Sequence, residues 1–408
     1  MAELLYGYVY FKDRLAGTIS QEPGERCSFV YDAGFLSGGA EAISITLPLR
    51  SEAYVYQGRL HPFFDNLLAE GRQAAIQARW LGVPVEDRFA RLLAFGEDCI
   101  GAVSVRDPKP RAATGEAPED AAELAALNSR ASISGVQSKL LVVETDDGFR
   151  PATAGELSTH IAKLASGNHP QIVPLEFLTT EAARMLLPDD AIVPVQIAPI
   201  PGIVDEALMV RRFDRPVEHG AIGKRHFEEF NQILNQRSED KYEGSYGDMA
   251  RVLRENPRCA LLDVDRLFRR ILVSILLGNN DAHMKNFALL YDQDQLRLSP
   301  FYDLLAAALY ADYSQTGMAL KLGQRTNPTT LAGIGAVHLL ALATSFSLKA
   351  AALREAVHDL GRRMAQAEET IRNAAHGTTE LRDQLADYMR KRWNGTFKPI
   401  IDSTGRRS

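Results

Sequence analysis

A mainly apolar run, Ile271–Leu277, ends at Gly278 and is followed at once by a polar loop, and this junction constrains the chain more than any other feature. The run is typical of a buried helix, and the Gly-Asn-Asn sequence after it is typical of a helix end. Asp281 and Asn286 then stand five residues apart. This D-x-x-x-x-N spacing is that of a phosphotransferase catalytic loop, in which the Asp accepts a hydroxyl proton and the Asn binds magnesium.

A second acid, Asp303, follows in the segment LSPFYDLL after a hairpin-like stretch. Two acids and an asparagine near the end of a buried helix are what metal-assisted phosphoryl transfer requires. Gly, Asn and Asp also favour plain turns, so the spacing taken alone is weak evidence. Asp281, His283 and Asp303 also suit a dinuclear hydrolase, because these side chains bind divalent metals. That alternative requires further histidines, and the sequence after His283 adds only His338, His358 and His376.

The composition is that of an ordinary globular protein. The 408 residues suggest two or three domains, with 46% hydrophobic and 24% charged residues. A net charge of −6 does not favour a globally basic nucleic-acid binder. The apolar runs are too short to span a bilayer, and the N-terminus has no secretory signal pattern. The cysteines Cys27, Cys99 and Cys259 form no CxxC, which indicates neither a disulfide framework nor a zinc site, so we expect a reducing cytoplasm.

The order of the expected elements is that of a two-lobed kinase. The first hundred residues alternate β-like runs (YGYVYF, CSFVY, AISITL, AYVY) with turns, and helices are predicted over 63–81 and 85–95. A proline-rich linker follows Asp107, then a helix over 119–128, strands at KLLVVET and 207–213, and a helix over 177–187. From about residue 225 the pattern is mainly helical. We therefore predict an α+β, bilobal protein-kinase-like fold with a β-rich N-terminal subdomain and a mainly helical C-terminal lobe.

Small residues before a strand mark a possible phosphate-binding loop. In ISGVQSKL, Gly135 lies among Ser132, Ser134 and Ser138, and Lys139 opens the strand. Such residues let backbone N–H groups approach phosphates, although a plain loop entering a strand has the same pattern.

Two further segments have residues suited to nucleotide binding. Lys163, on a strand-like stretch, could contact phosphates and pair with Glu176, or it could be a snorkelling surface lysine. The extended segment Met209–Arg215 could present its backbone to an adenine ring, or it could be a surface loop with Arg–Asp pairs.

Together these segments resemble the HipA family of bacterial serine/threonine kinases, the toxins of HipBA-type toxin–antitoxin modules. GNNDAHMKNFALL resembles the family's catalytic loop and LSPFYDLL its metal-binding segment. SISGVQSKL resembles its phosphate loop, THIAKL its ATP-lysine strand and VRRFDR its interlobe hinge. PFFDNLLAEG and GEDCIGAVSV resemble its extra N-terminal subdomain. The resemblance covers nearly the whole chain and implies the domains 1–107 (N-terminal subdomain), 108–130 (linker and short helix), 131–215 (N-lobe-like region) and 216–408 (helical C-lobe).

The resemblance also implies roles for individual residues. Asp281 would be the catalytic base, and Asn286 and Asp303 would bind Mg²⁺. The expected ATP-binding residues are Gly135, Val136, Gln137, Lys139, Lys163, Arg211, Phe213, His283 and Lys285. Ser132 takes the place of the family's autophosphorylated serine, and we add Ser134 because it shares the loop. Ser138 and Ala69 depart from the family's usual residues, and a less secure alignment at Glu176 puts its pairing with Lys163 in doubt.

The family implies a cytoplasmic, ATP- and Mg²⁺-dependent protein kinase that is inhibited by its own phosphorylation. Its expected partners are a helix-turn-helix antitoxin of HipB type and a protein substrate such as an aminoacyl-tRNA synthetase, with DNA contacted only through the antitoxin and no membrane. Two alternatives stay open. One is a non-catalytic regulatory subunit that binds the antitoxin on operator DNA, and the other is a metal-dependent phosphoesterase.

Overall fold

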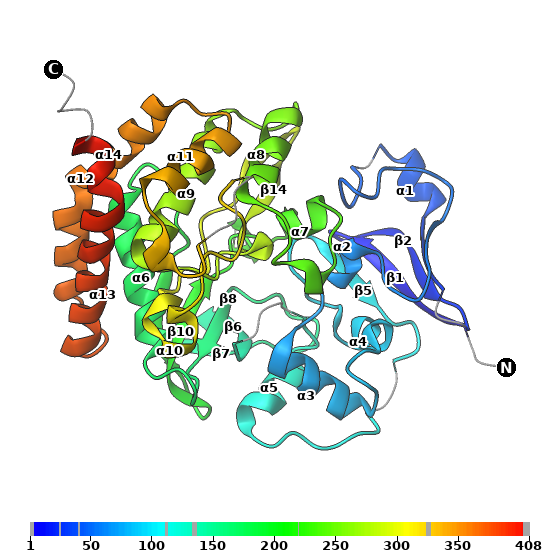
Figure 1. Ribbon diagram of the computed structural model, residues 1–408. Helices are drawn as coiled ribbons and strands as arrows, with labels where there is room; N and C mark the ends of the chain where they lie inside the picture. The colour runs from blue at the N-terminus through cyan, green and yellow to red at the C-terminus, as the bar shows by residue number, and fades with distance from the viewer. Residues whose placement is uncertain are drawn as a thin grey trace. The chain divides into compact units, whose positions relative to one another are not determined.

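A computed structural model describes residues 4–23, 26–39, 41–110, 113–132, 137–218, 220–323 and 328–402. The chain forms two compact units, and each is described by itself. Unit 1 contains residues 1–164 and 198–241, and unit 2 contains residues 165–197 and 242–408. The predicted α+β class, with a β-rich N-terminal region, is confirmed (Figure 1).

Unit 1 is built on two five-stranded sheets. The first has the order β4-β3-β2-β1-β5 and is antiparallel throughout. Its strands are β1 Leu5–Phe11, β2 Arg14–Gln21, β3 Cys27–Tyr31, β4 Tyr54–Tyr56 and β5 Val103–Arg106. The second has the order β7-β6-β8-β10-β9. Its strands are β6 Lys139–Thr145, β7 Gly148–Pro151, β8 His160–Leu164, β9 Val195–Ile200 (in unit 1 from residue 198) and β10 Val204–Arg211.

The remaining elements of unit 1 are short. They are α1 Ala33–Ser37, α2 Pro62–Asp65, α3 Gly71–Leu81, α4 Arg88–Phe95, α5 Ala121–Asn128, β11 Val217–Glu218, β12 Ala221–Ile222, β13 Phe227–Glu229, α7 Phe230–Ile233 and a 3-10 turn at Ser238–Asp240. The second sheet has one apolar core on each face. Leu140, Val142, Ala162 and Met209 belong to one core, and Leu141 and Val143 to the other.

Two predictions for this region are wrong in detail. The helix expected over 63–81 is two helices, α2 and α3, because the Asn66 side chain donates to the Pro62 and Gln236 carbonyls (both 2.8 Å) and ends the first. The strand expected at AISITL is a partly buried loop. Its backbone bonds to side chains instead of a neighbouring strand: the Tyr31 hydroxyl donates to the Leu47 carbonyl at 2.5 Å, and the Ile43 N–H donates to that hydroxyl at 3.1 Å.

Unit 2 is mainly helical, as predicted for the C-terminal part. Its helices are α6 Ile172–Leu186, α8 Tyr246–Glu255, α9 Leu262–Leu277, α10 Ala311–Ser314, α11 Ala336–Ser345, α12 Ala350–Arg372, α13 Thr379–Arg392 and α14 Lys398–Asp402, with 3-10 turns at Met284–Asn286, Ala307–Leu309 and Leu331–Gly333 and a π-turn at Trp393–Phe397. β14 Ala288–Asp292 and β15 Gln295–Leu298 form an antiparallel hairpin. The central helix α9 packs against α6, α8 and α13.

In the part of the chain that the structure describes, no single helix is long and apolar enough to cross a membrane. One bent pair, α11 with α12, passes the same criterion by length and composition only.

Candidate active site

The catalytic-loop candidate begins where α9 ends. Residues 271–277 of this helix are buried, as the apolar run predicts. Gly278 follows in the left-handed conformation (φ +84°), and its N–H donates to the Ser274 carbonyl. A Cβ at Gly278 would lie 2.8 Å from Cε1 of Tyr388. Both the backbone angle and the close approach of Tyr388 therefore require glycine here.

The Gly-Asn-Asn turn is fixed by the segment that follows Asp303. The Asn280 Nδ2 donates to the Tyr313 carbonyl (2.9 Å) and to the Thr316 hydroxyl (2.7 Å), and the Ala319 N–H donates to the Asn280 carbonyl (2.9 Å). The Ala308 N–H donates to the Gly278 carbonyl at 3.0 Å. These residues do form a turn, and its polar groups also hold the backbone next to Asp281.

Asp281 is half-buried, whereas the residues on either side of it are buried. The Tyr242 hydroxyl donates to its Oδ1 at 3.0 Å. The Tyr246 hydroxyl donates to the Ala282 carbonyl at 2.9 Å, and burial raises the pKa of Tyr246 far above its usual range. Tyr246 therefore stays protonated and supports the loop backbone. The His283 ring lies edge-on to Tyr242, with centroids 5.3 Å apart.

The two expected metal ligands lie in direct contact. The Asn286 Nδ2 donates to Oδ2 of Asp303 at 2.9 Å. Among the described residues the buried Asn286 Oδ1 has no hydrogen-bond partner. Asp303 has φ +60°, which is a costly conformation for a residue other than glycine. The pair thus presents amide and carboxylate oxygens, which are the ligands that Mg²⁺ prefers.

Buried contacts fix the Asp303 segment to α9. The Arg270 guanidinium binds Asp190 through two bonds of 2.7 Å and donates to the Ser299 carbonyl at 2.8 Å. Phe301 exchanges backbone hydrogen bonds with residues 191 and 193. The Tyr302 hydroxyl donates to the Lys285 carbonyl at 2.7 Å, which joins the segment to the catalytic-loop candidate.

The dinuclear hydrolase would bind its metals through several side chains of one site. Within the described ranges, no group of three His, Cys, Asp or Glu side chains is placed to hold a metal ion. The Asn286–Asp303 pair instead suits an ion that keeps water and substrate oxygens as its other ligands.

Unit 1 contains the other set of candidate residues. Lys139 on β6 and Lys163 on β8 are register partners, so their side chains lie on one face of the sheet. Lys163 is buried and is therefore not a snorkelling surface residue, while Lys139 is half-buried. The Gln137 Nε2 donates to the Leu164 carbonyl at 2.9 Å, which holds the start of β6 against the end of β8.

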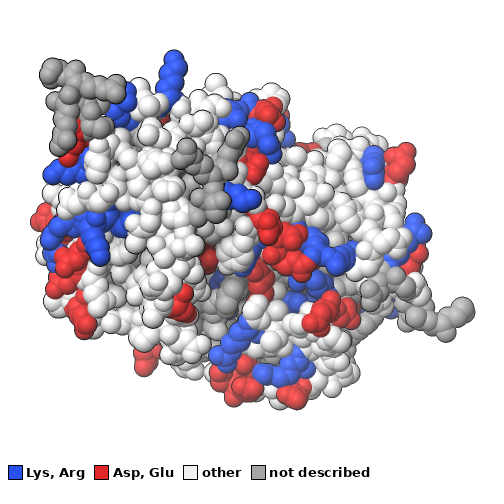
Figure 2. Space-filling model, in the orientation of Figure 1, with Lys and Arg blue, Asp and Glu red and all other residues white. Residues whose placement is uncertain are grey.

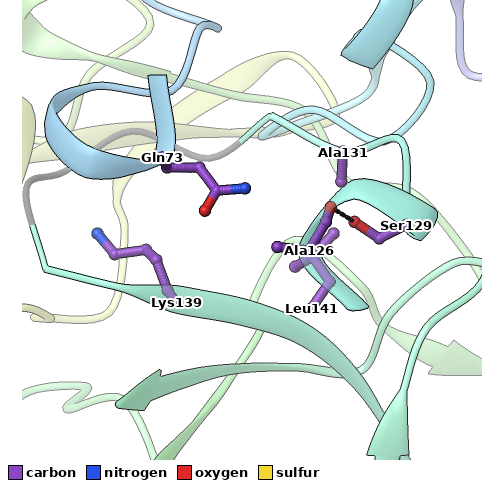
Figure 3. A pocket seen from close by; sticks show the side chains of 6 residues that line it. All are labelled: Gln73, Ala126, Ser129, Ala131, Lys139 and Leu141. Atoms are coloured by element: carbon purple, nitrogen blue, oxygen red, sulfur yellow. Dashed lines mark hydrogen bonds between the residues drawn. The ribbon is translucent and has the colours of Figure 1, made fainter. Parts of the chain in front are cut away.

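A small hollow opens beside Lys139 and is lined by Gln73, Ala126, Ser129, Ala131, Lys139 and Leu141. Figure 3 shows Lys139 and Gln73 on one side of this hollow, opposite Ala126, Ser129 and Ala131, and the Ser129 hydroxyl bonded to the Ala126 carbonyl. Ser132 follows nearby in sequence. It is fully buried, and its Oγ accepts the Ala69 N–H at 2.7 Å. Ser134, Gly135 and Val136 lie outside the described residues.

The hinge candidate, residues 209–215, differs from the surface loop of the alternative because most of its charged side chains are buried. Arg211 is exposed at the end of β10, and the Phe213 ring packs on Phe227 with centroids 4.9 Å apart. The Arg–Asp pairs of this segment are present, but they are buried. They also include Asp98, which is more than a hundred positions earlier in the sequence. Arg212 and Arg215 both bind Asp98 and Asp214, and we call these four residues the buried ion cluster.

Hydrogen bonds complete the buried ion cluster. Arg212 contacts Asp98 at 3.0 Å and Asp214 at 2.7 Å, Arg215 contacts Asp214 at 2.8 Å, and both guanidiniums donate to the Cys99 carbonyl. Burial alone would raise the pKa of each carboxyl, but the two guanidiniums outweigh it and hold the pKa values of Asp98 and Asp214 below the usual range.

Sequence reasoning missed four features of these sites: Tyr242 on Asp281, Asn280 as the anchor of the turn, Arg270 as the buried partner of the Asp303 segment, and Asp98 as the partner of Arg212. Tyr242 and Tyr246 stand four apart in KYEGSY, but that spacing has no known chemical meaning by itself. The other three make contacts across 33 to 114 positions of sequence.

Comparison with known proteins decides the family. Residues 7–106 match the HipA N-terminal domain, and residues 131–368 match the HipA-like C-terminal domain, which is more than half of the chain. The chain belongs to the HipA family. The resemblance found in the sequence is thereby confirmed.

Relatives agree with this assignment. The putative kinase Y4mE of Sinorhizobium fredii is 29% identical over 78% of this chain and 80% of its own length. Y4dM of the same organism, also named a putative kinase, is 32% identical over 69% and 70%. The serine/threonine-protein kinase toxin HipA of Shewanella oneidensis is 28% identical over 71% and 72%. The expected enzyme class, a protein kinase, is confirmed by this membership.

The fold agrees as well. HipA of Shewanella oneidensis, solved with HipB and its operator DNA, superposes with a TM-score of 0.77 at 22% identity and covers 97% of this chain and 99% of that one.

Proposed function

We propose that this HipA-family member is an ATP- and Mg²⁺-dependent serine/threonine protein kinase that acts as the toxin of a toxin–antitoxin module. The observation that carries the proposal is the Asn286–Asp303 pair with its buried amide oxygen, on the same loop system as Asp281. Magnesium would neutralise phosphate charge as it builds up during transfer.

The chain's own residues would do the remaining work. Asp281 would orient the acceptor hydroxyl and take its proton. Asn286 and Asp303 would hold the metal. The ATP contacts proposed in unit 1 are those of Lys139, Lys163, Gln137, Arg211 and Phe213, with Gly135 and Val136 in the phosphate loop. In unit 2 we assign His283 and Lys285 to the nucleotide as well. The division into domains 1–107, 108–130, 131–215 and 216–408 also stays a proposal.

The test is phosphate transfer by purified protein. Radiolabelled ATP is supplied with Mg²⁺ or with EDTA, alone and with cell lysate, and the labelled bands are identified by mass spectrometry. Transfer that needs both Mg²⁺ and Asp281 supports the kinase. If the protein binds its antitoxin but transfers no phosphate, the regulatory-subunit alternative is favoured. Phosphoester hydrolysis without ATP favours the phosphoesterase.

We further propose that phosphorylation of Ser132 or Ser134 inhibits the enzyme. Ser132 is the better supported, because its Oγ accepts a buried backbone N–H from Ala69. A phosphate there adds about −1.5 to −2 charge, which is not tolerated in that buried position. Modification would therefore require the segment to leave this site and would prevent its return. Phosphosite mapping after incubation with ATP, with the Asp281→Asn variant as control, decides whether either serine is modified.

The proposed partners are a helix-turn-helix antitoxin of HipB type and a protein substrate, possibly an aminoacyl-tRNA synthetase, in the cytoplasm. The HipA–HipB–operator structure from Shewanella oneidensis supports the first. Figure 2 shows acidic and basic side chains interspersed over the face that it draws, which supports DNA contact through the antitoxin rather than through a basic surface of this face. Co-expression with the gene product encoded next to this one, followed by co-purification, tests the pairing.

A further inference from the structure

The hydroxyl of Tyr242 contacts the residue that we propose as the catalytic base. It donates to Oδ1 of Asp281 at 3.0 Å. A serine or threonine hydroxyl that is about to be phosphorylated must make the same hydrogen bond with the base. One carboxylate oxygen thus already binds a hydroxyl from the chain itself.

The exposure of Tyr242 argues against a purely structural role. Its side chain is 47% exposed, whereas Tyr246, four residues later, is fully buried. Tyr246 donates to the Ala282 carbonyl, and its ring lies edge-on to Phe287 with centroids 6.2 Å apart. Tyr246 therefore has the packing expected of a residue that fixes the loop. Tyr242 instead lies at the surface, where its side chain can move without leaving a buried cavity.

We propose that Tyr242 occupies the acceptor-hydroxyl site of Asp281, and that a serine or threonine side chain of a protein substrate must displace it. The inference rests on the proposed kinase function and adds a residue that sets the affinity for acceptors. In this proposal the acceptor hydroxyl uses Oδ1, the oxygen that Tyr242 already binds, so the two hydroxyls compete for one position on the carboxylate. Only acceptors that gain binding energy elsewhere on the enzyme would displace the tyrosine efficiently.

A positioning role for Tyr242 makes the opposite prediction. If its hydrogen bond served to orient the carboxylate, then its loss would lower kcat and leave the KM for the acceptor unchanged. If Tyr242 competes with the acceptor, then its loss lowers that KM and leaves kcat nearly unchanged. The two roles are therefore separated by which constant moves.

The experiment compares Tyr242→Phe with the matched variant Tyr246→Phe in the full-length protein. Each change removes one hydroxyl and keeps the ring. The first readout is Asp281-dependent ATP hydrolysis, with water as the acceptor and ADP release as the signal. Without the Tyr242 hydroxyl, water can bond to Oδ1. We expect hydrolysis to rise by about three- to tenfold, which is the range set by the net contribution of one typical hydrogen bond.

The second readout uses dephosphorylated β-casein as a serine-bearing protein probe. Tyr242→Phe should lower the KM for casein by about three- to tenfold, while the KM for ATP stays the same. Tyr246→Phe should not lower the KM for casein, whatever its effect on kcat, because its hydroxyl bonds to a carbonyl and not to Asp281.

The outcomes separate the two proposals. If the wild type transfers phosphate in an Asp281-dependent way but Tyr242→Phe leaves hydrolysis unchanged or lowers it, then the competition by Tyr242 is overturned and the kinase assignment stands. If neither water, casein nor the protein itself receives phosphate in an Asp281-dependent way, then the kinase assignment fails and the inference fails with it.

Discussion

The amide nitrogen of Asn286 donates to Oδ2 of Asp303 at 2.9 Å, and this bond turns the other atom of the amide, Oδ1, toward a buried position where no described residue bonds to it. A buried acceptor without a partner costs about 1–3 kcal/mol. A bound cation would relieve that cost. This buried acceptor is the reason that we propose the pair as a metal site.

Asp303→Ala should abolish Mg²⁺-dependent ATP binding and leave the protein folded. The change removes a half-buried carboxylate and the acceptor of the Asn286 bond. Isothermal titration with ATP, in Mg²⁺ and in EDTA, measures the effect. Asp292→Ala is the matched control, since this acid is exposed at the end of β14. An ATP affinity that is equal to wild type at every Mg²⁺ concentration would refute the metal assignment.

Asp281→Asn should lower kcat by about 10²–10⁴-fold, the usual contribution of a general base. The amide keeps the shape and still accepts a hydrogen bond from Tyr242, so the melting temperature should stay near that of wild type. Phosphate transfer is measured under single-turnover conditions. Activity within threefold of wild type would rule out Asp281 as the base.

Gly278→Ala should destabilise unit 2 by about 1–3 kcal/mol, because alanine disfavours φ +84° and its Cβ would lie 2.8 Å from Tyr388. Since Asp281 is only three residues away, kcat should fall as well. Urea denaturation gives the free energy of unfolding. Gly335→Ala is the control, because its φ is −121° and nothing lies within 4 Å of the added Cβ. Equal effects of the two substitutions would contradict this reasoning.

Asp98→Ala should cost about 3–5 kcal/mol of folding stability, because it leaves two buried guanidiniums with a single carboxylate. The comparison is Glu156→Gln, which breaks an ion pair with Arg150 (2.6 Å) in which both side chains are partly exposed. That change should cost less than about 1 kcal/mol. Both substitutions lie in unit 1, so the free energies of unfolding of the two variants can be compared directly by denaturation. A cost for Asp98→Ala no greater than that for Glu156→Gln would show that the buried ion cluster adds little stability.

His226 should make unit 1 sensitive to mild acid. Burial lowers its pKa from 6.5 to about 3, so the folded protein keeps it neutral while the unfolded chain binds a proton below pH 6.5. Stability is unaffected above that pH and falls by about 1.4 kcal/mol per pH unit between 6.5 and 3 for this one group. His226→Gln should flatten the slope of unfolding free energy against pH by that amount. An unchanged slope would show that His226 does not remain neutral in the folded state.

The catalytic-loop candidate was predictable because its signals are local. The apolar run, the Gly278 stop and the five-residue spacing lie within sixteen consecutive positions, and the structure places a buried helix, a left-handed glycine and a 3-10 turn there. Strands β6 and β8 were predictable for the same reason. The predictions that failed concern segments whose structure depends on residues distant in the sequence. The AISITL run has strand composition, but the Tyr31 hydroxyl binds its backbone instead of a strand.

The burial of the hinge candidate also depends on residues that are distant in the sequence. VRRFDR shows charged residues in sequence, and charged residues are usually exposed. Only the structure shows that Asp98, more than a hundred positions earlier, makes burial of Arg212 and Arg215 tolerable. The hydrogen bond from Tyr242 to Asp281 likewise joins residues 39 positions apart, and no local sequence pattern predicts it.

The buried ion cluster also limits which N-terminal and C-terminal segments of different family members can be joined in one chimera. Asp98 lies in the segment that matches the HipA N-terminal domain, while Arg212, Asp214 and Arg215 lie in the segment that matches the C-terminal one. Two positive and two negative charges balance only when both segments are present. A chimera that joins the N-terminal segment of one relative to the C-terminal segment of another would take the charge at position 98 from one parent and the other three charges from the second. The sequence junction near residue 107 is thus a poor place to recombine such proteins unless both parents supply the same four charges.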